Sequence, residues 1–331
     1  MKSLERRVET SASAPPDVVK IDGVEGPRLI EQQGEPRPLG DARWDWSAVR
    51  RVLVVRLRSI GDTVLATPSL RALRRFLPEA RIDILLEDWV APLLEGYGEV
   101  DRVVTVERKS NSSRLRAARL LRSERYDVVY NLHGGSTAAL LTRATGARQR
   151  VGYAAYSYAS LHNHVAPPSS ALWGRAKTHS AEQQLALLGW TGVPVTDMPA
   201  SRLAVTTDAS ARVSRRLREA GLVEGSDFAL IHPAAAFDTK TWAAENFARV
   251  VEHLAARGLA TIAVAGPGEE RVISDLRTHT RAPLVSFTDL SLPELTALAS
   301  RASLFVGNDS GVAHVAAAVG APSVVVFGSS N

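Results

Sequence analysis

The sequence predicts an α/β protein with two domains of the doubly wound Rossmann type. Short runs of β-branched residues alternate with helical patterns from residue 51 to about residue 156, and the same alternation starts again after residue 207. Strands that alternate with helices form βαβ units and a parallel sheet. The length of 331 residues also suits two domains. We therefore expect one domain over residues 46–200 and another over residues 201–331, facing each other across a cleft.

The segment before these domains has a different composition. Residues 1–45 are rich in Pro, Gly, Glu and Ser and have no periodic apolar pattern. Such a segment has too little apolar surface to form a core, so we expect a disordered N-terminal extension.

The first domain begins with the run RVLVVRL at residues 51–57, a short apolar strand with polar flanks. Apolar residues at helical spacing follow it, at Leu65, Leu70, Leu73 and Phe76. A region with Pro167-Pro168, residues 155–178, reads as a long loop. The predicted strands are 51–57, 81–87, 102–106, 126–132 and 150–156, and the predicted helices are 63–78, 114–123, 136–146 and 179–190.

The second domain follows a linker at residues 191–203 and repeats the alternation. One of its helices opens with a Ser-x-x-Glu capping box at Ser291 and Glu294. The predicted helices are 208–221, 241–258, 268–279, 291–302 and 312–320, and the predicted strands are 228–233, 260–266, 283–287, 304–307 and 322–328.

Composition limits the classes of function. There is no cysteine, which excludes a disulfide framework and a thiolate metal site and fits a reducing compartment such as the cytoplasm. No run of about 18 apolar residues predicts a membrane span. Residues 51–200 hold 20 basic and 13 acidic residues, so the basic excess lies there. That segment suits nucleic acid, an acidic membrane surface or a phosphorylated substrate, or it is a soluble Arg-rich surface.

The turn VGNDSGVAH, residues 306–314, lies between a predicted strand and a helix of small residues. The free N–H groups and the positive dipole of a helix N-terminus bind anions. Asp309 or Ser310 alone would be explained as a helix cap. Glycines on both sides of this pair, together with His314 in the first turn, favour a diphosphate site.

Three further turns follow predicted strands and so point toward the same cleft. Lys240 stands before a helix, where it suits a phosphate or is a solvated surface residue. Glu269 and Glu270 follow a Gly-Pro-Gly turn and either accept from ribose hydroxyls or stabilise the helix dipole. Asp62 follows the first strand and is either an N-cap or a catalytic carboxylate.

Motifs that are missing from the sequence argue against other classes of protein. The G-x-G-x-x-G fingerprint of dinucleotide-binding enzymes is absent after the first strand, and no nucleic-acid-binding module is recognisable. His162 and His164 lie in the predicted loop without a carboxylate cluster, so we expect no metal there.

Four segments, in this order, resemble lipopolysaccharide heptosyltransferases of glycosyltransferase family 9, which have the GT-B fold. The resemblance covers residues 51–331 and rests on RVLVVRLRSIGDTVLATPSLRALRRFLP, KTWAAENFARVVEHLAARG, AGPGEE and VGNDSGVAHVAAAVGAPSVVVFG. It implies transfer of a heptose from ADP-L-glycero-β-D-manno-heptose to the inner core of lipopolysaccharide, with inversion and without a metal or cofactor. The implied location is the cytoplasm, with peripheral contact at the inner face of the inner membrane.

The resemblance also implies a role for each candidate residue. Asp62 would be the general base and Lys240 a ligand of the donor diphosphate. Glu269 or Glu270 would bind the ribose of the nucleotide. The donor-binding turn would comprise Asp309, Ser310, Gly311 and His314, and the acceptor contacts would comprise Arg58, Ser59, Gly61 and His133. The first domain would hold the lipid A–Kdo type acceptor, and the second would hold the nucleotide sugar.

Some features depart from the family pattern. Asn131 stands where many members have aspartate, and His133 where glutamine is common. The sequence ends at GSSN, where relatives continue into a further helix, so we expect an incomplete second domain. A family member with another sugar donor, and a GT-B protein that binds a nucleotide sugar without transferring it, are the alternatives.

Overall fold

The computed structural model describes residues 35–223 and 225–328 of the chain. Residues 1–34 of the expected disordered extension lie outside the described residues. Residues 35–45 correct that expectation, because they belong to the packed structure. The backbone N–H of Leu39 donates to the carbonyl of Gly189 over 2.9 Å, and Trp44 packs against Trp46 in a tilted arrangement with ring centroids 4.7 Å apart.

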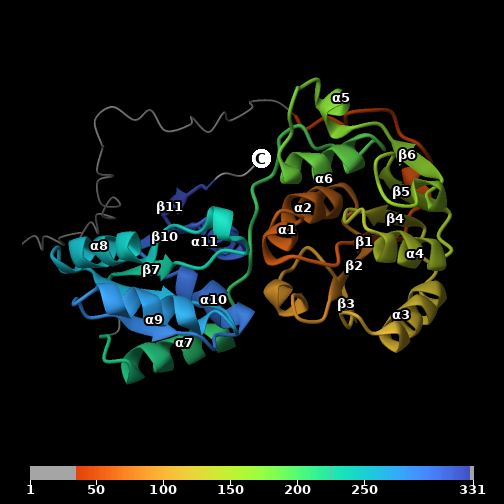
Figure 1. The fold of residues 1–331 in the computed structure, drawn as a ribbon. Helices are drawn as coiled ribbons and strands as arrows, with labels where there is room; N and C mark the ends of the chain where they lie inside the picture. Colours follow the sequence, from red (N-terminus) through yellow and green to blue (C-terminus); the bar gives the residue numbers. More distant parts are fainter. Residues whose placement is uncertain (1–34, 224, 329–331) are drawn as a thin grey trace, which may run out of the picture. The chain divides into compact units, whose positions relative to one another are not determined.

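The first sheet has six strands in the order β3-β2-β1-β4-β5-β6, and every neighbouring pair is parallel (Figure 1). Its central strand β1 is buried from Val52 to Val55, as expected for a parallel strand with helices on both faces of the sheet. The strands are β1 (Arg51–Val55), β2 (Arg81–Glu87), β3 (Arg102–Val106), β4 (Val128–Asn131), β5 (Gln149–Tyr153) and β6 (His164–Ala166).

Strand β6 lies inside the region that we expected to be a loop. It has three residues and pairs only with β5, at the edge of the sheet. A strand this short has no detectable alternation in its sequence, so only its neighbour defines it. The same region also contains the short helix α5 (Ser169–Trp173).

The predicted helix 63–78 is two helices, α1 (Ile60–Val64) and α2 (Thr67–Phe76). Pro68 is the reason: a proline lacks the N–H donor, and its ring would clash with the carbonyl four residues earlier, that of Val64, in a continuous helix. The other helices are near their predicted positions: α3 (Asn111–Ser123), α4 (Ser136–Ala144) and α6 (Ser180–Gly189). The 3₁₀ helix η2 (Ala91–Leu94) follows β2.

The second sheet has five parallel strands in the order β11-β10-β7-β8-β9. All five predicted strands and all five predicted helices are confirmed, including the capping box of Ser291 and Glu294. The strands are β7 (Phe228–His232), β8 (Ala260–Val264), β9 (Val285–Phe287), β10 (Leu304–Asn308) and β11 (Ser323–Val326). The helices are α7 (Thr207–Glu219), α8 (Ala244–Ala255), α9 (Glu270–His279), α10 (Leu292–Ala299) and α11 (Gly311–Ala318).

The strand order of each sheet fixes where a ligand can bind. The order reverses between β1 and β4 in the first sheet, and between β7 and β10 in the second. Open α/β sheets bind ligands beyond the carboxyl ends of the strands at such a switch point. The segments that follow β1, β4, β7 and β10 contain Asp62, His133, Lys240 and Ser310, so each predicted group of site residues except the two glutamates follows a switch-point strand.

Candidate active site

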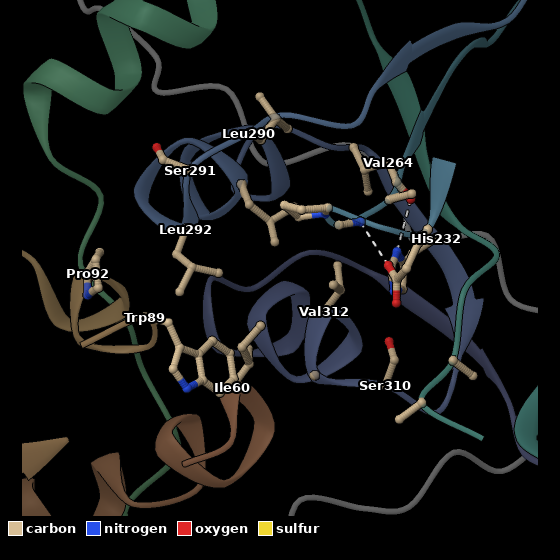
Figure 2. A pocket seen from close by; sticks show the side chains of 18 residues that line it. Ile60, Trp89, Pro92, His232, Val264, Leu290, Ser291, Leu292, Ser310 and Val312 are labelled. Atoms are coloured by element: carbon tan, nitrogen blue, oxygen red, sulfur yellow. Dashed lines mark hydrogen bonds between the residues drawn. The ribbon is translucent and has the colours of Figure 1, made fainter. Parts of the chain in front are cut away.

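A cavity of about 540 Å³ opens beyond the carboxyl ends of β7, β8 and β10 (Figure 2). Most of its wall is apolar, with Val264, Leu292 and Val312 among the residues of the second sheet and its helices. Three residues from the first sheet's side also line it: Ile60, Trp89 and Pro92. The other lining residues are His232, Ala235, Ala236, Ala265, Gly266, Pro267, Glu269, Leu290, Ser291, Leu295, Ser310 and Gly311.

The N-terminus of α11 borders this cavity without a side-chain cap among the described residues. Of the two residues that the sequence offered as a cap, Asp309 and Ser310, the N-cap is Ser310, yet its side chain does not bond to the helix N–H groups. Its hydroxyl oxygen is buried and has no hydrogen-bond partner within the described structure. A buried hydroxyl normally finds a partner, so a ligand oxygen at this helix end would satisfy both the hydroxyl and the free N–H groups.

Lys240 and Asp309 form an ion pair beside this helix end. The lysine Nζ donates to Asp309 Oδ2 over 2.6 Å, and the side chains are 27% and 21% exposed. The lysine ends a short 3₁₀ helix, Asp238–Lys240, in the loop after β7. An ammonium group has three donors, so Lys240 can keep the aspartate and still donate to a second anion.

Asn308 holds this loop in place, a role that the sequence analysis missed. Its side chain is fully buried at the end of β10. Its Nδ2 donates to the carbonyl of Pro233 over 2.7 Å, and its Oδ1 accepts from the backbone N–H of Trp242 over 3.1 Å. It therefore fixes both ends of the segment that carries Lys240.

His314 lies where α11 meets α1. A Cβ added to Gly61 would come within 2.7 Å of His314 Cδ2. Burial lowers the pKa of His314; the carboxylates of Asp309 and Asp62 raise it, whereas His179 and Lys240 lower it further. The pKa of this imidazole thus responds to Asp62 of α1 and to Lys240 and Asp309 from the loops of the second domain, and α1 packs directly against α11.

Asp62 is the third residue of α1 and is 38% exposed. Its Oδ2 accepts from the Ser59 hydroxyl over 3.2 Å, and its Oδ1 pairs with the Arg56 guanidinium at 2.5 Å. Arg56 is a buried residue that also donates to the carbonyl of Leu132, and its Nε has no partner in the described part of the chain. Arg56 was not among the predicted site residues, because an arginine inside a strand sequence gives no sign of which carboxylate it will contact.

The two glutamates after β8 separate in the structure. Glu269 lines the cavity, and its Oε2 accepts from the backbone N–H of Gly266 over 2.8 Å. Glu270 is exposed, does not line the cavity, and accepts from the backbone N–H of Gly268 over 2.9 Å. That bond lowers the pKa of Glu270. Glu269 is therefore the better candidate for ribose binding, because it lines the cavity and Glu270 does not.

A second, smaller pocket of about 270 Å³ lies beyond the first sheet, and we call it the basic pocket. Its walls include four cationic side chains, those of Arg58, Arg108, Lys109 and Arg114, and the N-terminus of α4 at Ser136 and Thr137. The other lining residues are Leu57, Glu87, Val106, Glu107, His133 and Gly135.

His133 connects the basic pocket to Asp62. Burial lowers the pKa of His133, the charges of Arg56 and Arg58 lower it further, and the carboxylates of Asp62 and Glu87 raise it. Its Nδ1 is buried and lacks a partner among the described residues. Asn131 shapes this turn, because its Oδ1 accepts from the backbone N–H groups of His133 and Gly134, each over 3.1 Å.

Not every predicted acceptor contact lines a pocket. Arg58 and His133 line the basic pocket, whereas Ser59 bonds to Asp62 and Gly61 packs on His314. Trp89, which was not among the predicted site residues, is 41% exposed and lines the larger cavity, and its Nε1 donates to Glu87 over 2.7 Å.

The histidines of the predicted loop make ordinary hydrogen bonds. His162 Nε2 lies 3.1 Å from Asn131 Nδ2, and His164 Nε2 lies 2.6 Å from Gln149 Oε1. Within the described residues, no group of three or more His, Asp or Glu side chains is arranged to hold a metal ion. Nor does any helix of the described ranges have the length and apolar character needed to cross a membrane.

Comparison with known proteins identifies the family. A model described as "Glycosyltransferase family 9 (heptosyltransferase)" matches residues 114–331. Lipopolysaccharide heptosyltransferase 3 of Escherichia coli is 28% identical over 293 residues, which cover 83% of this chain and 82% of the relative.

Solved structures support the fold. A family 9 glycosyltransferase from Veillonella parvula superposes with a TM-score of 0.75 at 22% identity, covering 83% of this chain and 80% of the other. The E. coli ADP-heptose lipopolysaccharide heptosyltransferase II superposes with a TM-score of 0.72 at 24% identity, covering 85% and 86%. The predicted GT-B architecture is thereby confirmed. The chain belongs to glycosyltransferase family 9, and the protein is a glycosyltransferase.

Proposed function

We propose that the protein transfers a heptose from an ADP-activated heptose to the inner core of lipopolysaccharide, with inversion at the anomeric carbon. The observation that carries this proposal is the packing of α1, which contains Asp62, against the free N-terminal end of α11, which lies beside the ion pair of Lys240 and Asp309. The names of the E. coli relatives support the choice of a heptose, an ADP leaving group and a lipopolysaccharide acceptor.

The second sheet and its helices would hold the donor. The apolar wall of the larger cavity suits the adenine ring, and Glu269, which lines this cavity, would accept from the ribose hydroxyls. The diphosphate would lie at the N-terminus of α11, where the Ser310 hydroxyl and Lys240 donate to it. These groups would stabilise the negative charge that develops as the bond from the anomeric carbon to the phosphate oxygen breaks. They supply the positive charge that a divalent cation supplies elsewhere, so we propose a metal-independent reaction.

The first sheet and its helices would hold the acceptor and the base. Asp62 would take the proton from the acceptor hydroxyl as the hydroxyl oxygen attacks the anomeric carbon. Because Asp62 and the diphosphate site belong to opposite sheets, attack comes from the side opposite the leaving group, which inverts the configuration. Arg56 orients the carboxylate of Asp62 through their ion pair.

The basic pocket would bind the anionic groups of the acceptor. Its four cationic side chains and the start of α4 suit a carboxylate or a phosphate, the charged groups of a Kdo-containing inner core. We place Arg58 and His133 in this acceptor site, together with Arg108, Lys109 and Arg114.

The test is to incubate the full chain with ADP-heptose and heptose-deficient lipopolysaccharide and to follow the acceptor by mass spectrometry. We expect the acceptor to gain one heptosyl residue, and the NMR coupling of the product to show the inverted anomer. Parallel reactions with ADP-glucose and a UDP-hexose test the donor. Transfer of only a different sugar would contradict the heptose assignment, and ADP-heptose binding without transfer would contradict catalysis.

A further inference from the structure

His232 is a buried histidine in the wall of the larger cavity, and the proposed function gives it no role. It ends strand β7 and is only 4% exposed. Its Nδ1 lies 3.0 Å from the carbonyl oxygen of Val264, a bond that Figure 2 shows. A carbonyl oxygen can only accept, so Nδ1 is the protonated nitrogen of the ring. The other nitrogen, Nε2, makes no hydrogen bond within the described residues.

The imidazole of His232 is neutral in this position. Burial lowers its pKa by more than the bond to Val264 and the charge of Glu269 raise it. A neutral imidazole with a protonated Nδ1 has a lone pair on Nε2 and can only accept a hydrogen bond there. His232 therefore provides a hydrogen-bond acceptor in the wall of the cavity.

Glu269 provides a second acceptor close to the first. Its Oε2 accepts from the N–H of Gly266 over 2.8 Å, whereas its Oε1 has no partner among the described residues. Val264 and Gly266 are two residues apart at the end of β8, so one short segment orients both side chains. Most of the cavity wall is apolar, and a buried polar atom without a partner costs free energy. Two neighbouring acceptors without a donor therefore indicate a ligand that donates two hydrogen bonds.

The strand order places these two acceptors beside the proposed diphosphate site. His232 pairs in register with Gly307 of β10, three residues before Ser310. On the other side of His232 lies β8, which is followed by the loop with Glu269. In a nucleoside diphosphate the ribose is bonded directly to the diphosphate, and its 2′ and 3′ hydroxyls are neighbouring donors. A diphosphate at the start of α11 would bring these two hydroxyls to the two acceptors.

We propose that His232 is a specificity-determining residue for the donor. Nε2 of His232 and Oε1 of Glu269 each accept from one of the two ribose hydroxyls, so that the cavity selects ribonucleotides over deoxyribonucleotides. A site that bonds two hydroxyls rejects an analogue that lacks one of them, because an acceptor is then left unpaired. The inference rests on the proposed function only in placing a nucleoside diphosphate in the larger cavity.

The test is calorimetry of the full chain with ADP, 2′-deoxy-ADP and 3′-deoxy-ADP. The wild type should bind each deoxy analogue at least about fivefold more weakly than ADP. His232→Asn can still donate to the carbonyl of Val264 but has no acceptor at the position of Nε2. It should bind ADP about fivefold or more weakly than the wild type does, and one of the two analogues within about twofold of the wild type. Equal affinities of the wild type for the three nucleotides, or unchanged affinity ratios in His232→Asn, would overturn the proposal.

Two further variants separate a direct contact from an indirect effect. Glu269→Ala should lose the preference for the other hydroxyl, and loss of the same preference in both variants would contradict one acceptor for each hydroxyl. His253→Asn changes an exposed histidine on α8 and should keep both ratios within about twofold of the wild type. An equal change in His253→Asn would contradict a role specific to His232. Because each ratio is measured on one preparation, partial unfolding of a variant does not alter it.

Inosine diphosphate, which lacks the amino group of adenine, tests the base as the other possible partner of His232. If His232→Asn lost the preference for ADP over inosine diphosphate and kept both preferences for the ribose hydroxyls, His232 would contact the base and the proposal would be wrong. The measurement needs no acceptor, so ribose selectivity without heptose transfer would contradict only the proposed function. Heptose transfer without ribose selectivity would contradict only this inference, and a wild type that does not bind ADP would contradict both.

Discussion

Gly61 and His314 lie against each other, with room for a hydrogen at Gly61 and not for a methyl group. An added Cβ would come within 2.7 Å of His314 Cδ2. The contact is reciprocal, because a Cβ on Gly311 would come within 2.9 Å of Ile60 Cβ. Two glycines thus allow α1 and α11 to approach, which places Asp62 opposite the turn with Asp309 and Ser310.

Gly61→Ala should therefore disturb the site more than the fold. The imidazole of His314 must shift to admit the methyl group, and a displacement of about 1 Å can lower a rate on the order of 100-fold. We expect kcat/KM for heptose transfer to fall between about tenfold and 100-fold. Gly98→Ala is the control, since nothing lies within 4 Å of its added Cβ. If Gly61→Ala had the same kcat/KM as the wild type, the contact between Gly61 and His314 would not be needed for transfer.

Lys240→Ala should weaken ADP binding at least about tenfold, measured by calorimetry, because it removes a charged donor worth about 1.5 kcal/mol or more. It also leaves Asp309 without its 2.6 Å partner, beside the proposed diphosphate. Lys109→Ala in the basic pocket is the matched control and should raise KM for the acceptor while ADP affinity stays unchanged. If both lysine variants lowered the affinity for ADP equally, the assignment of Lys240 to the donor site and Lys109 to the acceptor site would be wrong.

Asn308→Ala should destabilise the protein by about 2–4 kcal/mol in urea unfolding. The substitution leaves the carbonyl of Pro233 and the N–H of Trp242 without their buried partner. ADP affinity should fall as well, because the same segment carries Lys240. Asn111→Ala, at the exposed start of α3, should change stability by less than about 0.5 kcal/mol. A stable Asn308→Ala variant would show that the loop is held by other contacts.

The free energy of unfolding should fall as the pH drops below about 6.5, the ordinary pKa of histidine. Burial lowers the pKa of His162 and of His232, so the unfolded chain binds more protons than the folded one in this range. A group with a lowered folded pKa contributes stability above its unfolded pKa and loses it at lower pH, by up to about 1.4 kcal/mol per pH unit. Urea unfolding at pH 7.5 and 5.5 measures this, and His162→Gln should reduce the difference. A free energy of unfolding that stays constant over this range would contradict the prediction.

The sequence predicted the elements whose signal is local. The strands around RVLVVRL and LFVG, the capping box of Ser291 and the turn at residues 306–314 each show their pattern within a few residues. Strand β6 and residues 35–45 escaped prediction because pairing with distant segments defines them.

The same limit applies to the site. That the candidate residues follow the carboxyl ends of strands was predicted from the alternation of strands and helices, whereas the strand order that makes four of these strands switch-point strands came only from the structure. Three residues of the site escaped prediction because their partners cannot be read from spacing in the sequence. Arg56 pairs with the carboxylate of Asp62, and Asn308 bonds to two backbone groups in the loop after β7. Trp89, which follows a strand of the first sheet, lines a cavity that lies mainly in the second domain.

The most direct test of the central claim is heptose transfer by Asp62→Asn, with ADP binding measured on the same preparation. Asparagine keeps the size of the side chain and cannot accept the proton, so transfer should fall by about 10²–10⁴ while the ADP dissociation constant stays within about twofold. Asp88→Asn, an exposed carboxylate after β2, should transfer normally. An Asp62→Asn enzyme that transfers heptose at the wild-type rate would contradict the account.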